Sequence, residues 1–347
     1  MSSPDLNIGY MPLNDAAPLI IAKELGFFEQ AGLEVQLRKQ NSWATLRDKL
    51  HVGLLDAAHM LAPMPIASSL GLGCQPTAVV APLIMSQNGN AITLSNQLIE
   101  EVKKANNLKD LVFPMSSELL VPLIQKRKSQ GSAKLQFAHV FPYSCHYYQL
   151  LDWLRQGGIA LDEVEVHVIT PADIVDAMLN NDIDGFCVGS PWNAKAVRAG
   201  VGVTVTTSFD IWGNAPEKVL GILKTRYEEE PALFKRLIDA ITASCEWLSI
   251  LPNRFEAALI LSKTKYLDTP LEVVAPSLIG SCLTKTNTTP RELPLYNVFG
   301  SSENDNVIDT NIEDFEALQK HMLFAKQIHN EVPQSHLFEI FKPSMKG

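Results

Sequence analysis

The feature that most constrains this chain is a regular alternation of short apolar runs with helical segments, which continues to about residue 200. Such alternation predicts a mostly parallel α/β sheet in which helices connect successive strands. A chain of 347 residues can build two lobes with separate cores. We therefore expect a two-lobed α/β protein, with strands at 6–11, 32–40, 56–60, 76–85, 91–95, 135–141, 164–169 and 184–189.

Helical segments are expected between these strands and dominate after residue 215. Asp15 is expected to cap the first helix, which stops near Gly26. The stretch 284–310 is polar and rich in turn residues, so we predict a long surface loop. The other expected helices begin near Ser42, or lie near 62–73, at 119–131, from about 146 to 157, at 171–181, from 191 to 200, and at 226–248, 253–267 and 315–329.

Charge and cysteine usage exclude some classes of function. The formal net charge is −9, and the densest basic run is Lys126-Arg127-Lys128, so the chain is not expected to contact nucleic acid directly. The amino terminus lacks the basic and apolar regions of a signal peptide, and no run of about 18 apolar residues occurs. Five dispersed cysteines without a C-x-x-C pair indicate reduced thiols. We expect a cytoplasmic protein without a membrane segment, although a mature exported protein given a start Met would look similar.

Signatures of catalysis and of metal binding are missing from the sequence. It has no G-x-S-x-G elbow, no Walker loop and no G-x-G-x-x-G that opens a helix. The eight histidines are scattered, and pairs such as His321 with His329 have no carboxylate or thiol at a coordinating spacing. The chain is therefore predicted to be neither an enzyme nor a holder of a metal or cofactor.

Polar residues do occur where strands give way to helices. In CVGSPWNA (187–194), Ser190 is expected to cap a helix with Pro191 at its first position, and such a helix start suits an anion. Trp43 follows Ser42, His146 follows Ser144-Cys145, and Lys218 precedes the apolar run VLGIL. Each residue alone is more often a core or surface residue. Together they predict a ligand site, because open α/β sheets bind ligands at the carboxyl ends of their strands.

Five runs in this order resemble the nitrate-binding and bicarbonate-binding (NrtA-like) proteins of bacterial ABC transporters: DAAPLIIAKELGFFEQAGLEV, KQNSWATLRDKL, AHMLAPMPIASSLGLG, CVGSPWNA and NAPEKVL. Within that family, the chain is most similar to the NasS-type nitrate and nitrite sensors, which lack a signal peptide. The resemblance implies a periplasmic-binding-protein-like fold of type II with the ligand in the interlobe cleft. It places 1–88 and 192–347, with a helical C-terminal return, in lobe I and 89–191 in lobe II.

The resemblance also implies a set of ligand-binding residues for nitrate or nitrite. An indole N–H, a lysine ammonium, and amide or imidazole donors suit a planar anion that only accepts hydrogen bonds. Two departures from the family pattern bear on this set: Ser190 stands where transport relatives carry an acidic residue, and Asn90 stands where nitrate binders carry a longer Gln. The serine at position 190 argues against calcium and bicarbonate as ligands. The expected ligand residues are Trp43, Asn90, His146, Val188, Gly189 and Lys218.

Three roles follow from the resemblance. A NasS-type sensor holds a NasT-type antiterminator, an RNA-binding protein with an ANTAR domain, until the anion arrives, and thereby controls nitrate assimilation genes. The alternative is the extracytoplasmic solute-binding subunit of a nitrate ABC transporter. A third reading is an enzyme of the thiamine-pyrimidine synthase group, which shares the two-lobed fold. The cysteine-rich signature of that group is absent from this sequence.

Overall fold

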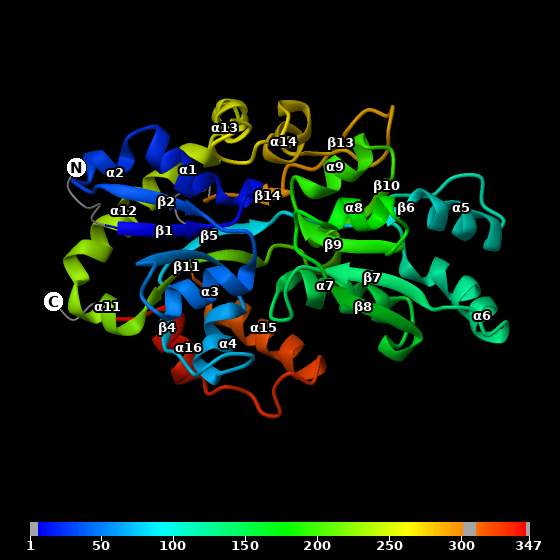
Figure 1. The fold of residues 1–347 in the computed structure, drawn as a ribbon, viewed down its shortest axis with the longest axis horizontal. Helices are drawn as coiled ribbons and strands as arrows, with labels where there is room; N and C mark the ends of the chain where they lie inside the picture. Colours follow the sequence, from blue (N-terminus) through cyan, green and yellow to red (C-terminus); the bar gives the residue numbers. More distant parts are fainter. Residues whose placement is uncertain (1–5, 301–309, 345–347) are drawn as a thin grey trace.

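The computed structural model describes residues 6–300 and 310–344, and two separate β-sheets organise these residues (Figure 1). The seven-stranded sheet of lobe I has the order β14-β5-β11-β3-β1-β2, with β4 paired to β11. Its strands are β1 (Leu6–Tyr10), β2 (Val35–Lys39), β3 (Ala57–Leu61), β4 (Val79–Val80), β5 (Ile84–Asn88), β11 (Pro216–Leu223) and β14 (Asn297–Val298).

The five-stranded sheet of lobe II has the order β10-β6-β9-β7-β8. Parallel pairs occur within both sheets, β1 with β2 and β3, and β7 with β8 and β9, whereas β11 and β6 run antiparallel to their neighbours. The strands are β6 (Asn90–Ser95), β7 (Leu135–His139), β8 (Val164–Val168), β9 (Gly185–Gly189) and β10 (Gly202–Thr207). A separate two-stranded ribbon joins β12 (Ser281–Cys282) to β13 (Arg291–Glu292).

Helices cover the sheets of both lobes (Figure 1). In lobe I these are η1 (Asn14–Ala16), α1 (Ala17–Glu24), α2 (Phe27–Gln30), α3 (Trp43–His51), α4 (Met64–Leu70) and α11 to α14, at Lys224–Glu229, Pro231–Ser249, Asn253–Leu261 and Leu271–Leu278. In lobe II they are α5 (Asn96–Ala105), η2 (Ser117–Leu120), α6 (Val121–Ser129), α7 (Cys145–Gln156), η3 (Leu161–Glu163), α8 (Ile174–Leu179), α9 (Trp192–Arg198) and α10 (Ser208–Trp212).

The chain crosses between the lobes at two places near their interface. It leaves lobe I at Asn88-Gly89, both with positive φ, between β5 and β6. It returns through residues 208–215 between β10 and β11. The Asn88 side chain ties the two crossings together, because its Nδ2 donates to Asn214 Oδ1 at 3.0 Å and the Ala215 N–H donates to its Oδ1 at 3.2 Å.

The C-terminal segment adds a third connection between the lobes. Helix α15 (Ile312–Phe324) packs against α7 and α10 of lobe II, where Trp212 stacks on His321 with ring centroids 4.4 Å apart. Helix α16 (Gln334–Phe341) packs against α4 and β4 of lobe I, and the Ala81 N–H donates to the Ile340 carbonyl at 2.7 Å. We call residues 310–344 the C-terminal clasp, since they hold both lobes from one side.

Most of the expected strands and helices are present, but several elements were not foreseen. Helix α5 and strand β10 fall in stretches with no expected element, and β11 replaces an expected change to helices after residue 215. Strand β11 opens on Pro-Glu-Lys, which does not read as a buried strand, yet it lies between β3 and β5. The expected lobe boundary at 191/192 does not coincide with the change of sheet, because β10 pairs with β6.

The expected surface loop at 284–310 is in part a structured strap. Strand β14 within it pairs with β5 of lobe I, while the Arg291 guanidinium donates to the Phe113 carbonyl of lobe II at 2.6 Å. Residues 301–309 of that expected loop lie outside the described residues.

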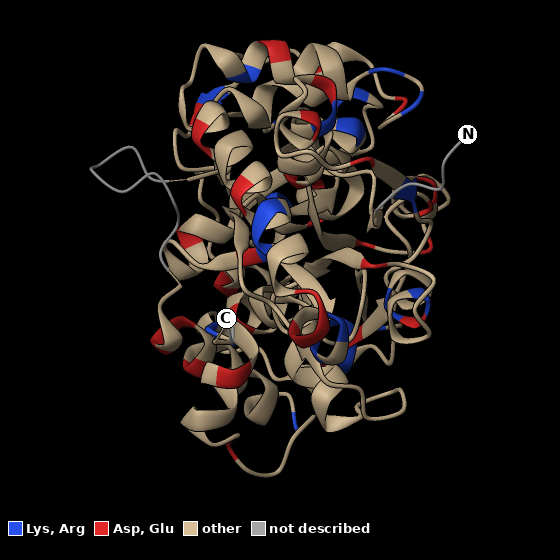
Figure 2. Ribbon diagram, turned by 90° about the vertical axis from the view of Figure 1, so that its left-hand side faces the viewer, with Lys and Arg blue, Asp and Glu red and all other residues tan. Residues whose placement is uncertain are grey.

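Lys and Arg are interspersed with Asp and Glu over the visible ribbon and do not form a basic stripe (Figure 2). Within 6–300 and 310–344, none of the helices is both long enough and apolar enough to traverse a lipid bilayer.

Candidate functional site

The residues singled out in the sequence meet at the interface of the two lobes. Lobe I contributes Trp43, the first residue of α3, and Lys218 in β11. Lobe II contributes Asn90 at the start of β6, Gly189 at the end of β9, and His146 in the first turn of α7. The β6–β9 register pairs Asn90 with Gly189. All four side chains are almost fully buried, at 0–1% exposed.

Lys218 is the centre of an ion-paired cluster. Its Nζ lies 2.7 Å from Asp15 Oδ2 and 2.7 Å from Glu217 Oε1. The ammonium also lies over the Trp43 ring, 5.6 Å from its centroid, within the range of a cation–π contact. Two of its three N–H donors are therefore committed to carboxylates, which leaves one for a ligand.

Hydrogen bonds from lobe II reach the same cluster. Asn90 Nδ2 donates to Glu217 Oε2 at 2.7 Å and to Gln149 Oε1 at 2.9 Å. His146 Nε2 lies 3.8 Å from Glu217 Oε1. Glu217 thus belongs to lobe I by sequence but is held by side chains of lobe II, so this contact couples the site to the relative position of the lobes.

Several buried polar atoms at this site have no hydrogen-bond partner. A buried polar group without a partner costs about 1–3 kcal/mol, so native structures rarely leave many together. Their concentration at one place provides hydrogen-bonding capacity that a ligand could satisfy. The atoms are Trp43 Nε1, His59 Nδ1, both ring nitrogens of His146, and Asn90 Oδ1.

Gly189 lies beside two of these atoms, Asn90 Oδ1 and His146 Nε2. A Cβ built at this position would lie 3.3 Å from Asn90 Oδ1, 3.4 Å from Asp15 Oδ2 and 3.6 Å from His146 Nε2. The absence of a side chain at Gly189 therefore lets polar groups from both lobes approach its backbone closely. The neighbouring Val188 is fully buried and contributes its side chain to the apolar core.

Burial and neighbouring charges shift the pKa values of the titratable groups of the site in different directions. Burial raises the pKa of Glu217 to about 7, against the opposing charge of Lys218. Burial would also raise the pKa of Asp15, but Lys218 and His59 hold it well below its usual range. Burial lowers the pKa of both His59 and His146, so neutral imidazoles are favoured. Burial would lower the pKa of Lys218, but the charges of Asp15 and Glu217 raise it.

Two predicted caps are wrong in detail. Helix α1 has Ala16 at its N-cap, and the Asp15 carboxylate turns instead to Lys218 and to His59, whose Nε2 lies 3.2 Å from Asp15 Oδ1. Helix α9 has Pro191 at its N-cap without a side-chain bond. The Ser190 hydroxyl donates to the Gly89 carbonyl at 3.3 Å. In contrast, Ser42 and Ser144 cap α3 and α7 as the helix-start pattern indicates.

Sequence reasoning missed four polar members of the cluster: Asp15 as an ion-pair partner, His59, Gln149 and Glu217. His59 interrupts the apolar strand AAHML, and Glu217 lies beside Lys218 in a strand whose eight residues are nearly all buried. A polar residue inside a run that must be buried needs a partner, so this signal was available for His59 but not for Glu217, whose strand was not foreseen. Gln149 lies within an ordinary amphipathic helix and carried no such signal.

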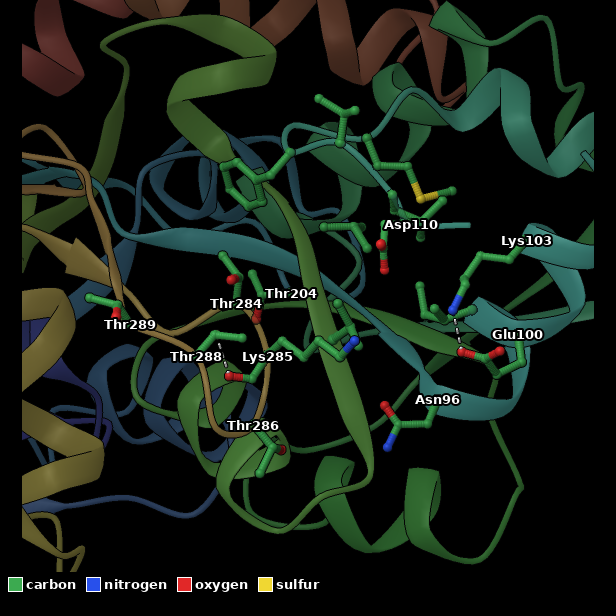
Figure 3. Close-up of a pocket in the computed structure, with 17 residues that line it drawn as sticks. Asn96, Glu100, Lys103, Asp110, Thr204, Thr284, Lys285, Thr286, Thr288 and Thr289 are labelled. Atoms are coloured by element: carbon green, nitrogen blue, oxygen red, sulfur yellow. Dashed lines mark hydrogen bonds and ion pairs between the residues drawn. The ribbon is translucent and has the colours of Figure 1, made fainter. Parts of the chain in front are cut away.

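A hollow lies at the edge of lobe II, away from this cluster (Figure 3). It has a volume of about 370 Å³ and lies between α5, β10 and the strap at 284–289. Figure 3 shows Lys103 directed toward Glu100, with their charged atoms 2.9 Å apart. None of the predicted site residues lines it. The described residues contain no group of three or more His, Cys, Asp or Glu arranged to hold a metal ion.

Comparisons with known proteins agree with one family. Residues 1–262 match the model of the NMT1-like family. The nitrate import ATP-binding protein NrtC of Synechocystis sp. PCC 6803 is 36% identical over 278 residues, 79% of this chain and 39% of NrtC. The nitrate/nitrite binding protein NrtA of Nostoc sp. PCC 7120 is 33% identical over 267 residues, 75% of this chain and 58% of NrtA. The chain thus spans well under two thirds of these relatives.

A solved structure covers nearly the whole chain. The periplasmic nitrate-binding protein NrtA from Synechocystis PCC 6803 matches with a TM-score of 0.88 at 25% identity, over 99% of this chain and 88% of that chain. The expected two-lobed, periplasmic-binding-protein-like fold is confirmed. The clasp lies beyond the residues that the family model matches.

Proposed function

The chain belongs to the NMT1-like family, and from this premise we propose that it binds nitrate or nitrite between its two lobes. The observation that carries the proposal is the cluster of buried, unpartnered polar atoms around the Lys218 ammonium at the lobe interface, among them Trp43 Nε1 and the ring nitrogens of His146. Relatives named as nitrate or nitrite binding proteins support the choice of anion.

The donor set suits a small anion that only accepts hydrogen bonds. Trp43 Nε1 can only donate, Lys218 has one N–H left, and the neutral imidazole of His146 presents one N–H. Charge-assisted hydrogen bonds contribute about 1.5–3 kcal/mol each. A few of them in a closed site are enough for an affinity in the micromolar range, which corresponds to about −8 kcal/mol. The proposed role is binding and not catalysis.

For the physiological role, the comparisons favour a solute-binding component of a nitrate ABC transporter. The similar proteins are named as import components or as a periplasmic binding protein. The sensor hypothesis, in which a cytoplasmic form releases a NasT-type antiterminator, rests on the resemblance of the sequence motifs. Size-exclusion chromatography of the chain mixed with such an antiterminator, with and without nitrate, tests it. Failure to co-elute in either condition would leave the transport role.

A thermal-shift series tests the binding proposal. Nitrate and nitrite at millimolar concentration should raise the melting temperature, because a ligand that binds only the folded state stabilises it by mass action. Chloride and sulfate serve as controls for ionic strength and should have little effect. An equal shift with all four anions, or no shift with nitrate and nitrite, would contradict the proposal.

A further inference from the structure

We propose that Glu217 is the proton-coupled residue of this site, so that a bound monovalent anion is accompanied by a neutral, protonated Glu217 carboxyl. The inference rests on the proposed function, since it concerns the same site. Its basis is the position of the carboxyl: it shares the Lys218 ammonium with Asp15, it is 1% exposed, and its Oε2 accepts from Asn90, whose side chain borders Gly189.

The charge of the closed site depends on Glu217 alone. The titratable groups that face it come from every element packed around it: Lys218 of β11, Asp15 of η1, His59 of β3, Cys145 and His146 of α7, and Cys187 of β9. Burial raises the pKa of both thiols and lowers the pKa of both imidazoles, so these four groups are neutral.

The remaining charges then decide what an anion encounters. Lys218 and Asp15 cancel, so an ionised Glu217 leaves one negative charge in the empty site. A monovalent anion would bring a second, and uncompensated buried charge is costly because the interior screens it poorly. Protonation of Glu217 removes that repulsion. Since burial raises the pKa of Glu217 to about 7, this protonation is accessible near neutral pH.

Asp15 is a poorer proton acceptor than Glu217. Its Oδ2 accepts from Lys218 at 2.7 Å, and its Oδ1 lies 3.2 Å from His59 Nε2. Burial raises its pKa, but these partners outweigh burial and keep the carboxylate ionised. Glu217 is therefore the carboxyl of this cluster whose charge changes.

Both oxygens of the Glu217 carboxyl accept a hydrogen bond. Asn90 Nδ2 donates to Glu217 Oε2 at 2.7 Å, so this oxygen keeps its role as an acceptor. Oε1 faces Lys218 at 2.7 Å and His146 Nε2 at 3.8 Å. If the proton sits on Oε1, this oxygen no longer accepts from the ammonium, so a second N–H of Lys218 becomes free for the anion. The same O–H adds one donor to the set.

Titration calorimetry with nitrate in buffers of different ionisation enthalpy measures the protons taken up on binding. At about pH 8, above the pKa of Glu217, the wild type should take up close to one proton per anion. Its affinity should fall by about tenfold for each unit of rising pH in that range. Glu217→Gln should bind with almost no proton uptake and with an affinity that changes little with pH. Glu24→Gln, which alters a carboxyl paired with Lys265 and Tyr266 far along α1, should behave like the wild type.

The outcomes separate the two proposals. Nitrate binding by the wild type without proton uptake at about pH 8 would overturn the role of Glu217 and leave anion binding standing. Proton uptake that persists in Glu217→Gln would also overturn the role of Glu217 and leave anion binding standing. If that variant does not fold, infrared difference spectra of the wild type decide: the C=O stretch of a protonated carboxyl should grow when nitrate is added, and its absence would refute the inference. No heat from nitrate in any buffer would refute both proposals.

Discussion

The Lys218 ammonium lies 2.7 Å from the Asp15 carboxylate, and the two side chains are 0% and 2% exposed. The pair joins strand β11 to the short helix η1 at the interface of the lobes. Lys218 is thus a structural residue as well as the cation expected to attract an anion. A buried charge that loses its partner is strongly destabilising, whereas an exposed ion pair contributes little.

Lys218→Met should abolish nitrate binding and also destabilise the fold. Removal of the ammonium leaves the Asp15 and Glu217 carboxyls buried without their cation. Breaking a buried pair in this way costs about 3–5 kcal/mol. Urea unfolding measures the loss of stability and calorimetry measures binding. The double variant Lys218→Met with Asp15→Asn should recover part of the stability but none of the binding. Wild-type affinity in either variant would contradict the assignment of the site.

Trp43→Phe should weaken nitrate binding while keeping the ring packed. The change removes only the indole N–H, which has no partner in the ligand-free site. A single neutral hydrogen bond is worth about 1 kcal/mol, so the dissociation constant should rise about fivefold. Trp153→Phe is the matched control, because that indole donates to the Met115 carbonyl within lobe II at 3.0 Å. Trp153→Phe should lower stability without changing the affinity, and equal loss of affinity in both variants would argue against a role for Trp43.

Glu217→Gln should become more stable relative to the wild type as pH rises. The pKa of Glu217 is about 7 in the folded protein, above the ordinary value of about 4.3 for an unfolded chain. The folded state therefore holds its proton longer, so the stability this provides is present at low pH and is lost as pH rises to about 7. The difference in unfolding free energy should grow by on the order of 2–4 kcal/mol between about pH 4 and pH 7. Urea unfolding of both proteins at several pH values checks it, and a constant difference would contradict it.

Asp152→Asn should loosen the C-terminal clasp. Asp152 Oδ2 accepts from Trp212 Nε1 at 2.8 Å and lies 3.0 Å from His321 Nδ1 of α15. Burial would raise the pKa of Asp152, but these partners lower it, so the carboxylate is ionised at neutral pH. Loss of the charge should cost about 1–3 kcal/mol and speed amide hydrogen exchange in α15.

Asp239→Asn is the control for that prediction. Asp239 pairs with Lys235 at 2.7 Å, but both side chains are more than half exposed, so the pair contributes little. Unchanged exchange in α15 of Asp152→Asn would show that this contact does not hold the clasp.

The parts of the fold with a local sequence signal could be predicted. Ser42 and Ser144 mark the starts of α3 and α7, because a hydroxyl caps a helix wherever the chain goes next. These starts position Trp43 and His146, so those residues could be proposed for the site. The six proposed ligand residues do lie together, although their contact with an anion stays a prediction.

The parts that depend on long-range pairing could not be predicted. Strand β11 begins with polar residues, and only its place between β3 and β5 explains why it is a strand. Asp15 is suited to cap a helix, but its carboxylate pairs instead with the buried Lys218, 203 positions along the chain. A charged partner in a buried site outweighs a cap worth about 1 kcal/mol. The local pattern holds no information about that competition.

Calorimetric titration of nitrate into the wild type and into Gly189→Ala tests the central claim most directly. The added Cβ would lie 3.3 Å from Asn90 Oδ1, 3.4 Å from Asp15 Oδ2 and 3.6 Å from His146 Nε2, so the Asn90 side chain must shift by a few tenths of an ångström and the Cβ crowds the proposed anion site. Ser190→Ala, one residue along the chain, is the control and should bind like the wild type. We predict binding of one anion per chain for the wild type and an affinity at least about tenfold weaker for Gly189→Ala, with similar melting temperatures. Equal affinities in the wild type and Gly189→Ala, or no binding in the wild type, would contradict the account.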